Sequence, residues 1–227
     1  MKITKVTDRH VVFTVLENAK GGFVNMGLIL GKRHNFIIDT GMGISNVEAI
    51  LKYIADNHEV KPIIAINTHA HWDHVLGNET LKGGLIISHV LCRRMMEEHW
   101  GDIEEHIQKT REYFDEKLYK CLPNLVFEGN LDFSEEGISI FHTPGHSDDG
   151  ISVYDAVDKV LYVGDNFGIF DGVAHLWAEN TRADQSIIEI YKGYDFDICI
   201  PSHSEPQRGD VIGLLEVALA KAKSDGK

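Results

Sequence analysis

The first part of the chain alternates apolar and polar residues with the two-residue period that is typical of β-strands. We expect four short strands there, over residues 3–6, 11–16, 23–30 and 35–38. From Ser45 onwards the pattern changes to a helical period, and Ser45 or Asn46 is the expected N-cap residue. The apolar side of this helix is expected to carry Val47, Ile50, Leu51 and Ile54. An apolar run at residues 62–66 then predicts a buried strand, and this order of elements indicates helices packed on a sheet.

The second part of the chain repeats the same order of elements. The pattern predicts strands over residues 138–142, 151–155, 160–163 and 196–200. Helices are expected at residues 185–191 and at about residues 209–222. Two halves that each run from strands to helices indicate a mixed α/β (α+β) protein, in which two sheets are covered by helices. We expect residues 1–227 to form a single domain of this kind.

A charged segment separates the two halves, and its apolar residues have the spacing of amphipathic helices. It covers about residues 92–122 and is predicted to be a helical insertion. Its apolar positions are Met96, Trp100, Ile103, Ile107, Phe114 and Leu118. Two interpretations remain open. The segment is either a surface helix that covers the core, or a lid beside a functional site or the seam of a homodimer, formed by Met96, Trp100, Ile103 and Ile107.

Composition and charge narrow the classes of function. With 43 % hydrophobic residues, the chain can bury a core of its own. Its formal net charge of -13 disfavours nucleic acid as a partner, because nucleic-acid surfaces depend on clustered Lys and Arg. No apolar run approaches the about 20 residues that cross a bilayer, so we expect no membrane partner. A secretion signal is not recognisable, and the three widely spaced cysteines suggest no disulfide framework, which together predict a cytoplasmic protein.

Four potential metal ligands lie within six positions directly after the strand predicted at residues 62–66. They are His69, His71, Asp73 and His74. Core packing does not require such a cluster. Three later strands each lead into one further donor, and these donors are His146, Asp165 and His203. Because loops at the carboxyl ends of strands converge on one crevice in α/β proteins, we expect all seven side chains to form a single metal site.

The number and chemistry of these donors indicate two metal ions. Seven donors are too many for one four-coordinate zinc ion, but they suit two ions that share a bridging carboxylate. Nitrogen-rich donors without a thiolate favour zinc and also permit iron or manganese. Two such divalent ions would lower the pKa of a water between them and so provide a metal-bridging hydroxide as the nucleophile. Asp73 is the candidate catalytic residue, because it could orient that nucleophile or carry its proton to the leaving group.

The HxHxDH motif at residues 69–74 resembles the signature of the metallo-β-lactamase superfamily. Other motifs follow in the order of that family: Asn25, Asp39-Thr40-Gly41, Thr143-Pro144-Gly145-His146-Ser147, Gly164-Asp165 and His203. The resemblance implies a four-layer αββα sandwich with the metals at one edge. It also implies the division of the ligands: one metal takes His69, His71 and His146, the other takes Asp73, His74 and His203, and Asp165 bridges them. Asp39 would support the site without binding metal, and we expect a surface or packing role for His89, His142 and His175.

The same resemblance implies a metal-dependent hydrolase that acts on an ester, a thioester or a similar bond of a small-molecule substrate. Residues 68–78 look most like glyoxalase II and its thioesterase relatives, although only one helix is expected after His203, where glyoxalase II carries a helical domain. Antibiotic hydrolysis is disfavoured, because secreted zinc β-lactamases have Cys in place of Asp165 or lack the bridging ligand. An iron-dependent oxidoreductase similar to persulfide dioxygenases and a phosphodiesterase remain as alternatives. A binding protein without turnover is disfavoured, because no metal ligand is missing.

Overall fold

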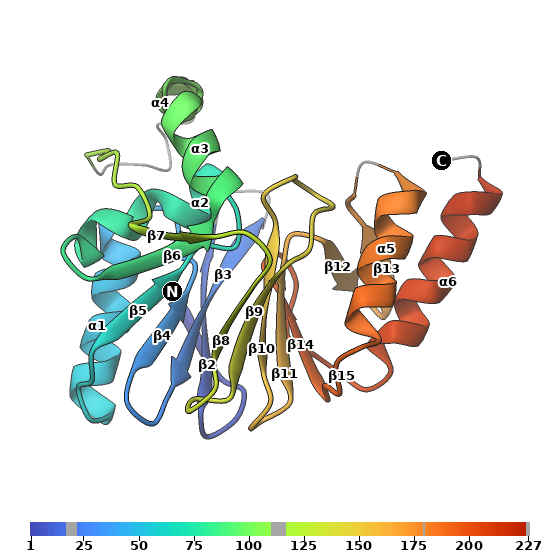
Figure 1. Ribbon diagram of the computed structural model, residues 1–227, viewed down its shortest axis with the longest axis horizontal. Helices are drawn as coiled ribbons and strands as arrows, with labels where there is room; N and C mark the ends of the chain where they lie inside the picture. Colours follow the sequence, from blue (N-terminus) through green and yellow to red (C-terminus); the bar gives the residue numbers. More distant parts are fainter. Residues whose placement is uncertain (17–21, 110–116, 179, 226–227) are drawn as a thin grey trace. The chain divides into compact units, whose positions relative to one another are not determined.

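The computed structural model describes residues 1–16, 22–109, 117–178 and 180–225. The chain divides into two compact units, Met1–Phe127 (unit 1) and Glu128–Lys227 (unit 2), and each unit is built on its own main β-sheet (Figure 1). Within the described ranges, no helix combines the length and the apolar character needed to span a membrane.

Unit 1 contains a seven-stranded sheet whose strands follow one another in chain order. The strands are β1 (Lys2–Lys5), β2 (His10–Leu16), β3 (Phe23–Leu30), β4 (Asn35–Ile38), β5 (Ile63–Ile66), β6 (Leu85–His89) and β7 (Leu125–Phe127). The first four strands pair antiparallel, whereas β4 to β7 are parallel neighbours. Because β4, β5 and β6 end at the same edge of the sheet, the loops that follow them are brought together.

Helix α1 (Ile44–Asn57) packs against this sheet with the apolar side that the sequence predicts. Val47, Ile50 and Ile54 are buried in one cluster with side chains of β2, β3 and β4. The predicted N-cap is wrong, since Gly43 occupies that position. The side chain of Asn46 instead accepts a hydrogen bond from the backbone N–H of Met42 at 2.8 Å, and so stabilises the turn before the helix. Two short helices, α2 (Trp72–Val75) and η1 (Leu76–Leu81), follow β5.

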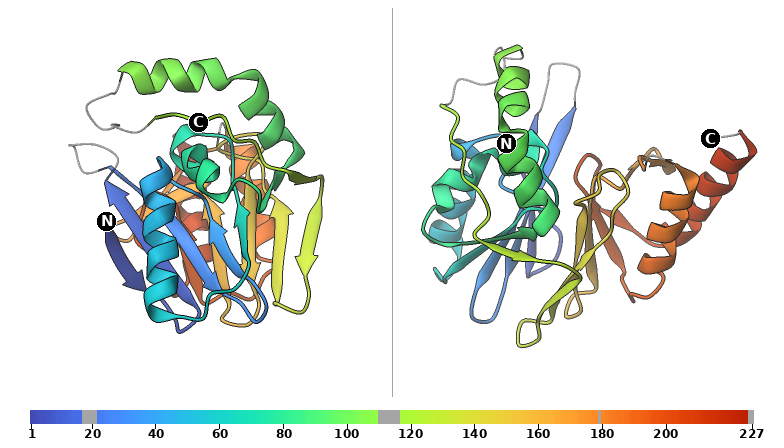
Figure 2. Two further views of the ribbon diagram at one scale, coloured as in Figure 1. Left: turned by 90° about the vertical axis from the view of Figure 1, so that its left-hand side faces the viewer. Right: turned by 45° about the horizontal axis from the view of Figure 1, so that its top comes forward.

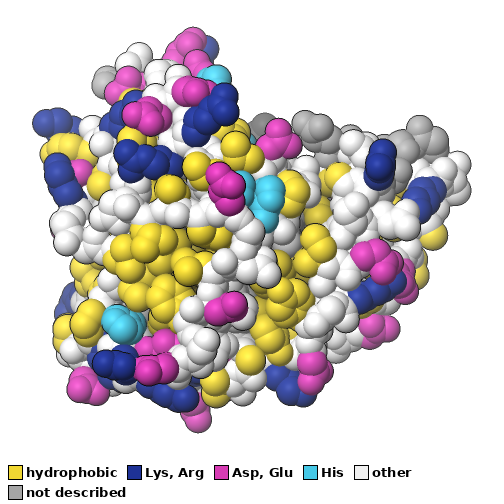
Figure 3. Space-filling view, viewed as in Figure 1, with side chains coloured by type: hydrophobic (Ala, Val, Ile, Leu, Met, Phe, Trp, Pro, Cys, Tyr) yellow, Lys and Arg dark blue, Asp and Glu magenta, His cyan; other side chains and the backbone are white. Residues whose placement is uncertain are grey.

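The predicted helical insertion forms two helices, α3 (Val90–Glu98) and α4 (Trp100–Lys109), which both belong to unit 1 (Figure 2). Their apolar sides share one buried cluster with the segment around α2, composed of Ala70, Val75, Leu76, Cys92, Met96, Trp100 and Ile107. The outer side of the two helices carries charged side chains of both signs (Figure 3). The packing therefore favours the interpretation of helices that cover the core, and the homodimer stays a prediction. Phe114 lies outside the described residues.

Unit 2 contains a six-stranded sheet in the order β15-β14-β11-β10-β9-β8. The strands are β8 (Asn130–Phe133), β9 (Ile138–His142), β10 (Ile151–Asp155), β11 (Val160–Gly164), β14 (Ile198–Pro201) and β15 (Gln207–Arg208). Strands β11 and β14 are parallel neighbours, and β9 and β11 both run antiparallel to β10. The strands β9, β11 and β14 therefore all end at the same edge of the sheet.

Two helices of unit 2, α5 (Thr181–Tyr191) and α6 (Val211–Ser224), lie side by side and pack into one core cluster with residues of β9, β11 and β14 (Figures 1 and 2). Helix α5 begins four residues before the predicted start, because Asn180 caps it by accepting hydrogen bonds from Arg182 N and Ala183 N, both at 3.1 Å. A separate hairpin, β12 (Phe167–Phe170) and β13 (Val173–Leu176), precedes α5.

Candidate metal centre

The four donors of the HxHxDH motif lie together after β5 in unit 1. His69, Asp73 and His74 are buried, and His71 is exposed. The Nε2 atom of His69 lies 3.0 Å from Nδ1 of His71, and Nε2 of His74 lies 3.3 Å from Oδ2 of Asp73. The predicted donors of unit 1 thus form two close pairs, His69 with His71 and Asp73 with His74. In each pair, two potential ligand atoms lie next to each other.

Asp39, which follows β4, contacts the HxHxDH motif at His74 and the residue before the motif, Thr68. Its Oδ1 accepts a hydrogen bond from the backbone N–H of Thr68 at 2.7 Å, and its Oδ2 accepts one from Thr68 Oγ1 at 2.8 Å. The same Oδ2 lies 2.8 Å from Nδ1 of His74. A carboxylate at this position favours the tautomer with the proton on Nδ1 and leaves Nε2 as the atom that can bind a metal. Asp39 is therefore placed to orient His74, as the resemblance implied.

A buried amide network holds the backbone next to His74. Its carbonyl oxygen accepts a hydrogen bond from Thr40 N at 2.8 Å and lies 3.4 Å from Nδ2 of Asn67. Asn67 and Asn78 exchange two side-chain hydrogen bonds, at 3.1 and 2.9 Å. Neither asparagine is predicted from the sequence. Their signal in the sequence is that an amide side chain lies on each side of the motif, with Asn67 directly after β5 and Asn78 within η1.

The three donors of unit 2 come from loops after three different strands, with His146 after β9, Asp165 after β11 and His203 after β14. Oδ2 of the buried Asp165 lies 3.1 Å from Nε2 of His203 and 3.6 Å from Nε2 of His146. They meet because all three strands end at the same edge of the sheet. A single carboxylate oxygen that faces two imidazoles fits the expected part of Asp165 as a shared ligand.

Asn166, directly after Asp165, connects the loop of His146 to the core of unit 2. Its Nδ2 donates to Thr143 O at 3.1 Å and to the hydroxyl of Tyr191 at 2.9 Å. Its Oδ1 accepts from the backbone N–H of His146 at 3.3 Å. Burial raises the pKa of Tyr191, so this phenol keeps its proton and lies 2.9 Å from the hydroxyl of Ser152. This network positions one metal-ligand candidate and was also missed from the sequence.

Gly145, next to His146, offers a first prediction on stability. A Cβ atom there would lie 2.1 Å from Cδ1 of Ile187 and 2.8 Å from Oδ1 of Asn166. We expect Gly145→Ala to lower the free energy of unfolding by about 1–3 kcal/mol, because the crowded side chains must move. Urea denaturation measures this change. The control is Gly101→Ala in α4, where a Cβ meets nothing within 4 Å and alanine is the better helix former, so an equal loss in both variants would contradict the prediction.

The three remaining histidines named in the sequence analysis are absent from both donor sets. His89 is the N-cap residue of α3 and accepts a hydrogen bond from Leu91 N. The Nε2 atom of His142 lies 2.7 Å from the carbonyl oxygen of Asp148. His175 is exposed on β13. Two of these side chains thus serve the local structure, in agreement with the expected packing role.

The fold of the chain is similar to that of solved structures described as metallo-beta-lactamases. A structure described as a metallo-beta-lactamase from Pontibacter korlensis superposes with a TM-score of 0.76 and covers 96 % of this chain and 98 % of that chain. At 19 % sequence identity, this likeness shows the fold alone. The mixed α/β fold of metallo-β-lactamase type that the sequence predicts is therefore confirmed.

The family assignment rests on the sequence. The family model of the metallo-beta-lactamase superfamily matches residues 19–203, which include every predicted donor. The chain belongs to this superfamily. Members of this fold bind divalent metal ions, and the imidazole and carboxylate donors described above have the matching chemistry. Zinc as the metal and the glyoxalase II-like branch stay predictions.

Two curated relatives carry names of thioesterases. The chain is 22 % identical over 188 residues to "Acyl-coenzyme A thioesterase MBLAC2" from Gallus gallus, which covers 76 % of this chain and 67 % of that protein. It is 28 % identical over 174 residues to "Atrochrysone carboxyl ACP thioesterase" from Aspergillus chevalieri, which covers 72 % of this chain and 47 % of that protein. The match thus spans about two thirds of the first relative and less than half of the second.

Proposed function

We propose that this chain is a metal-dependent thioesterase, a hydrolase that cleaves the thioester bond of a small-molecule acyl thioester such as an acyl-coenzyme A. The observation that carries the proposal is the pair of prepared donor sets, one held by Asp39 in unit 1 and one gathered around Asp165 in unit 2. The thioester as substrate is supported by the names of two relatives. The donors alone suit several hydrolytic reactions.

The proposal assigns the seven donors to two divalent ions. One ion would be held by His69, His71 and His146, the other by Asp73, His74 and His203, and Asp165 would be a ligand shared by both. The chemistry of the donors supports this assignment, because each group supplies nitrogen and carboxylate ligands without a thiolate. Zinc is the proposed metal, with iron or manganese as alternatives. The family model further supports the assignment of donors from both units, since the match of that model runs through both units.

The chain's own residues have defined parts in this proposal. When bound, two divalent ions supply Lewis-acid chemistry, which acidifies a water between them and polarises the thioester carbonyl. Asp39 keeps the proton of His74 on Nδ1, and Asn166 fixes the backbone of His146. Oδ2 of Asp73 is the proposed acceptor for the proton of the attacking water, and it passes that proton to the sulfur of the leaving thiolate, which is released as the thiol.

Metal analysis joined to a substrate panel tests the proposed function. The purified protein is assayed with thioester, lactone, phosphodiester and β-lactam substrates, before and after treatment with a chelator. We expect two metal ions per chain and thioester hydrolysis that is lost on chelation and restored by Zn, Mn or Fe. Iron without any hydrolysis would favour the oxidoreductase alternative. A preference for phosphodiesters over thioesters would favour a phosphodiesterase instead.

A further inference from the structure

The two faces of the β12–β13 hairpin have different surroundings. One face carries Phe167, Ile169, Ala174 and Leu176, which pack into the core of unit 2. The other face, here called the outer face, consists of Gly168, Phe170, Val173, His175 and the following Trp177. On this face Phe170 is 42 % exposed and Val173 is 56 % exposed. Phe170 and Val173 therefore give this face an exposed apolar area within the described part of unit 2.

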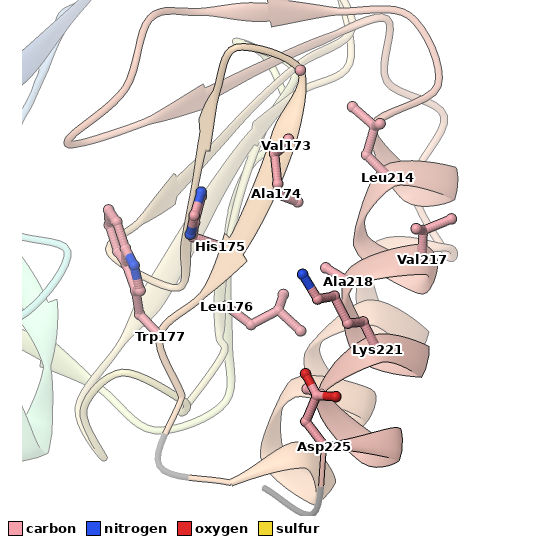
Figure 4. A pocket seen from close by; sticks show the side chains of 12 residues that line it. Val173, Ala174, His175, Leu176, Trp177, Leu214, Val217, Ala218, Lys221 and Asp225 are labelled. Carbon is pink, nitrogen blue, oxygen red and sulfur yellow. The ribbon is translucent and has the colours of Figure 1, made fainter.

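The outer face continues directly to a proposed metal ligand. The ring centre of Trp177 lies 6.0 Å from that of His203 and 6.3 Å from that of Phe170. Figure 4 shows the side chains of His175 and Trp177 on one side of β13, and that of Leu176 on the side of α6. In addition, Ser204 Oγ accepts a hydrogen bond from Ile169 N at 3.1 Å, which ties β12 to the loop of His203. A surface of aromatic rings thus begins beside the candidate site.

Gly168 makes this arrangement of rings sterically possible. A Cβ atom at this position would lie 2.7 Å from Cε2 of Phe170 and 2.8 Å from Cη2 of Trp177. Real Cβ atoms do not tolerate such distances, so any other residue here would push the two rings away from the strand. The two rings pack over the glycine, and Phe170 remains 42 % exposed.

A groove that shares part of its lining with the outer face provides the comparison. It has a volume of about 420 Å³ and lies between β13 and α6, and its lining includes Val173, His175 and Trp177 as well as Leu214, Val217 and Lys221 of α6 (Figure 4). Phe170 and the seven candidate metal ligands are outside this lining. A substrate that is held at those ligands is therefore expected to contact Phe170 rather than the α6 side of this groove.

We propose that the outer face binds the hydrocarbon part of the substrate's acyl group, with the thioester carbonyl next to His203. This inference rests on the proposed thioesterase function. The charge of the hairpin itself favours the acyl part of the substrate, because residues 160–181 contain no Lys or Arg. A carrier such as coenzyme A has phosphate groups, which are usually bound by cationic side chains or helix N-termini. The exposed aromatic and aliphatic side chains instead fit an apolar acyl chain.

The test compares substrates that differ only in the length of the acyl chain. For the wild-type protein, kcat/KM with decanoyl-coenzyme A should clearly exceed kcat/KM with acetyl-coenzyme A, because a bound hydrocarbon chain loses contact with water. We expect Phe170→Ala to lower the ratio of these two values about tenfold. Val173→Ala, at the cross-strand neighbour of Phe170 that also lines the groove, should lower the ratio in the same direction. The matched control is Val217→Ala in the groove, an equally simple change at a side chain that is 71 % exposed, and it should keep the ratio within about twofold.

Binding of S-decyl-coenzyme A, a thioether that cannot be hydrolysed, separates this inference from the proposed function. If the wild-type protein cleaves no thioester, the proposed function fails, but a Kd for this thioether that Phe170→Ala raises about tenfold still supports the surface. An unchanged Kd and an unchanged selectivity ratio in both Phe170→Ala and Val173→Ala would overturn the inference. So would a loss of selectivity in Val217→Ala alone, because the acyl chain would then lie in the groove.

Discussion

Replacing Asp73 by Asn is expected to lower kcat for thioester hydrolysis by a factor of about 10²–10⁴, the range in which a positioned proton acceptor usually contributes. The amide has nearly the shape of the carboxylate, but it carries no charge and cannot accept the proton of the attacking water. Asp73 is buried, and its Oδ2 lies 3.3 Å from Nε2 of His74. Steady-state kinetics on the metal-loaded variant measure the effect.

The variant also tests whether Asp73 is a ligand, provided that metal content is measured together with activity. The control is Asp148→Asn, which neutralises an exposed carboxylate two residues after His146 and should leave kcat within about twofold. If the metal content of Asp73→Asn drops and excess metal restores it while kcat stays low, Asp73 is both a metal ligand and the proton acceptor. Asp73→Asn protein with full metal content and wild-type kcat would mean that Asp73 has neither role.

Parts of the fold could be predicted because their pattern is local. The strands β3, β4, β9 and β10 have the predicted boundaries, since their alternating or continuous apolar runs end at polar or turn residues. The β12–β13 hairpin was missed, although Asp171-Gly172 is a typical two-residue hairpin turn. Both residues have positive φ, 51° for Asp171 and 75° for Gly172, as that turn requires. Its strands have only four residues each, which is too short for a clear alternation of apolar and polar positions.

The site could be predicted only in its outline. The seven candidate donors were predicted from their position after strands, because metal ligands must come in clusters and four of the seven lie within six positions; their role as ligands stays a prediction. The residues that position these candidate donors could not be predicted from their place after strands. Asn166 and Tyr191 are 25 positions apart, and Asn67 and Asn78 are 11 apart, so their pairing depends on how strands and helices are arranged in space. Asp39 was expected to support the site, but that its partners are Thr68 and His74 follows from the parallel pairing of β4 and β5.

Replacing Asp39 by Asn is expected to weaken metal binding about 10- to 100-fold, as is usual when the partner of a metal-binding histidine is removed. Three donors meet the carboxylate of Asp39: the N–H and the hydroxyl of Thr68, and Nδ1–H of His74. The side chain of Asn has only one acceptor oxygen, and its NH₂ group would face the hydrogen-bond donors that the second carboxylate oxygen of Asp39 now accepts from. His74 then loses the partner that keeps its proton on Nδ1, and its Nε2 is no longer held ready for a metal. Asn also tolerates the left-handed backbone at this position, where φ is 59°, so the fold should remain.

Titration with a competing chelator measures the affinity for Zn²⁺, and thermal unfolding of the metal-free protein shows whether the variant is folded. The control is Asp155→Asn, a change at a buried carboxylate at the end of β10, whose Oδ1 accepts a hydrogen bond from Val157 N at 2.8 Å. This control alters a buried turn at a residue that belongs to neither group of candidate metal ligands, so the affinity for Zn²⁺ should stay within about twofold of the wild type. Wild-type affinity in Asp39→Asn would show that His74 needs no partner on Nδ1. A loss of similar size in Asp155→Asn would attribute the effect to general loosening of the fold. A loss confined to Asp39→Asn would instead link the affinity of the site to one carboxylate that binds no metal itself.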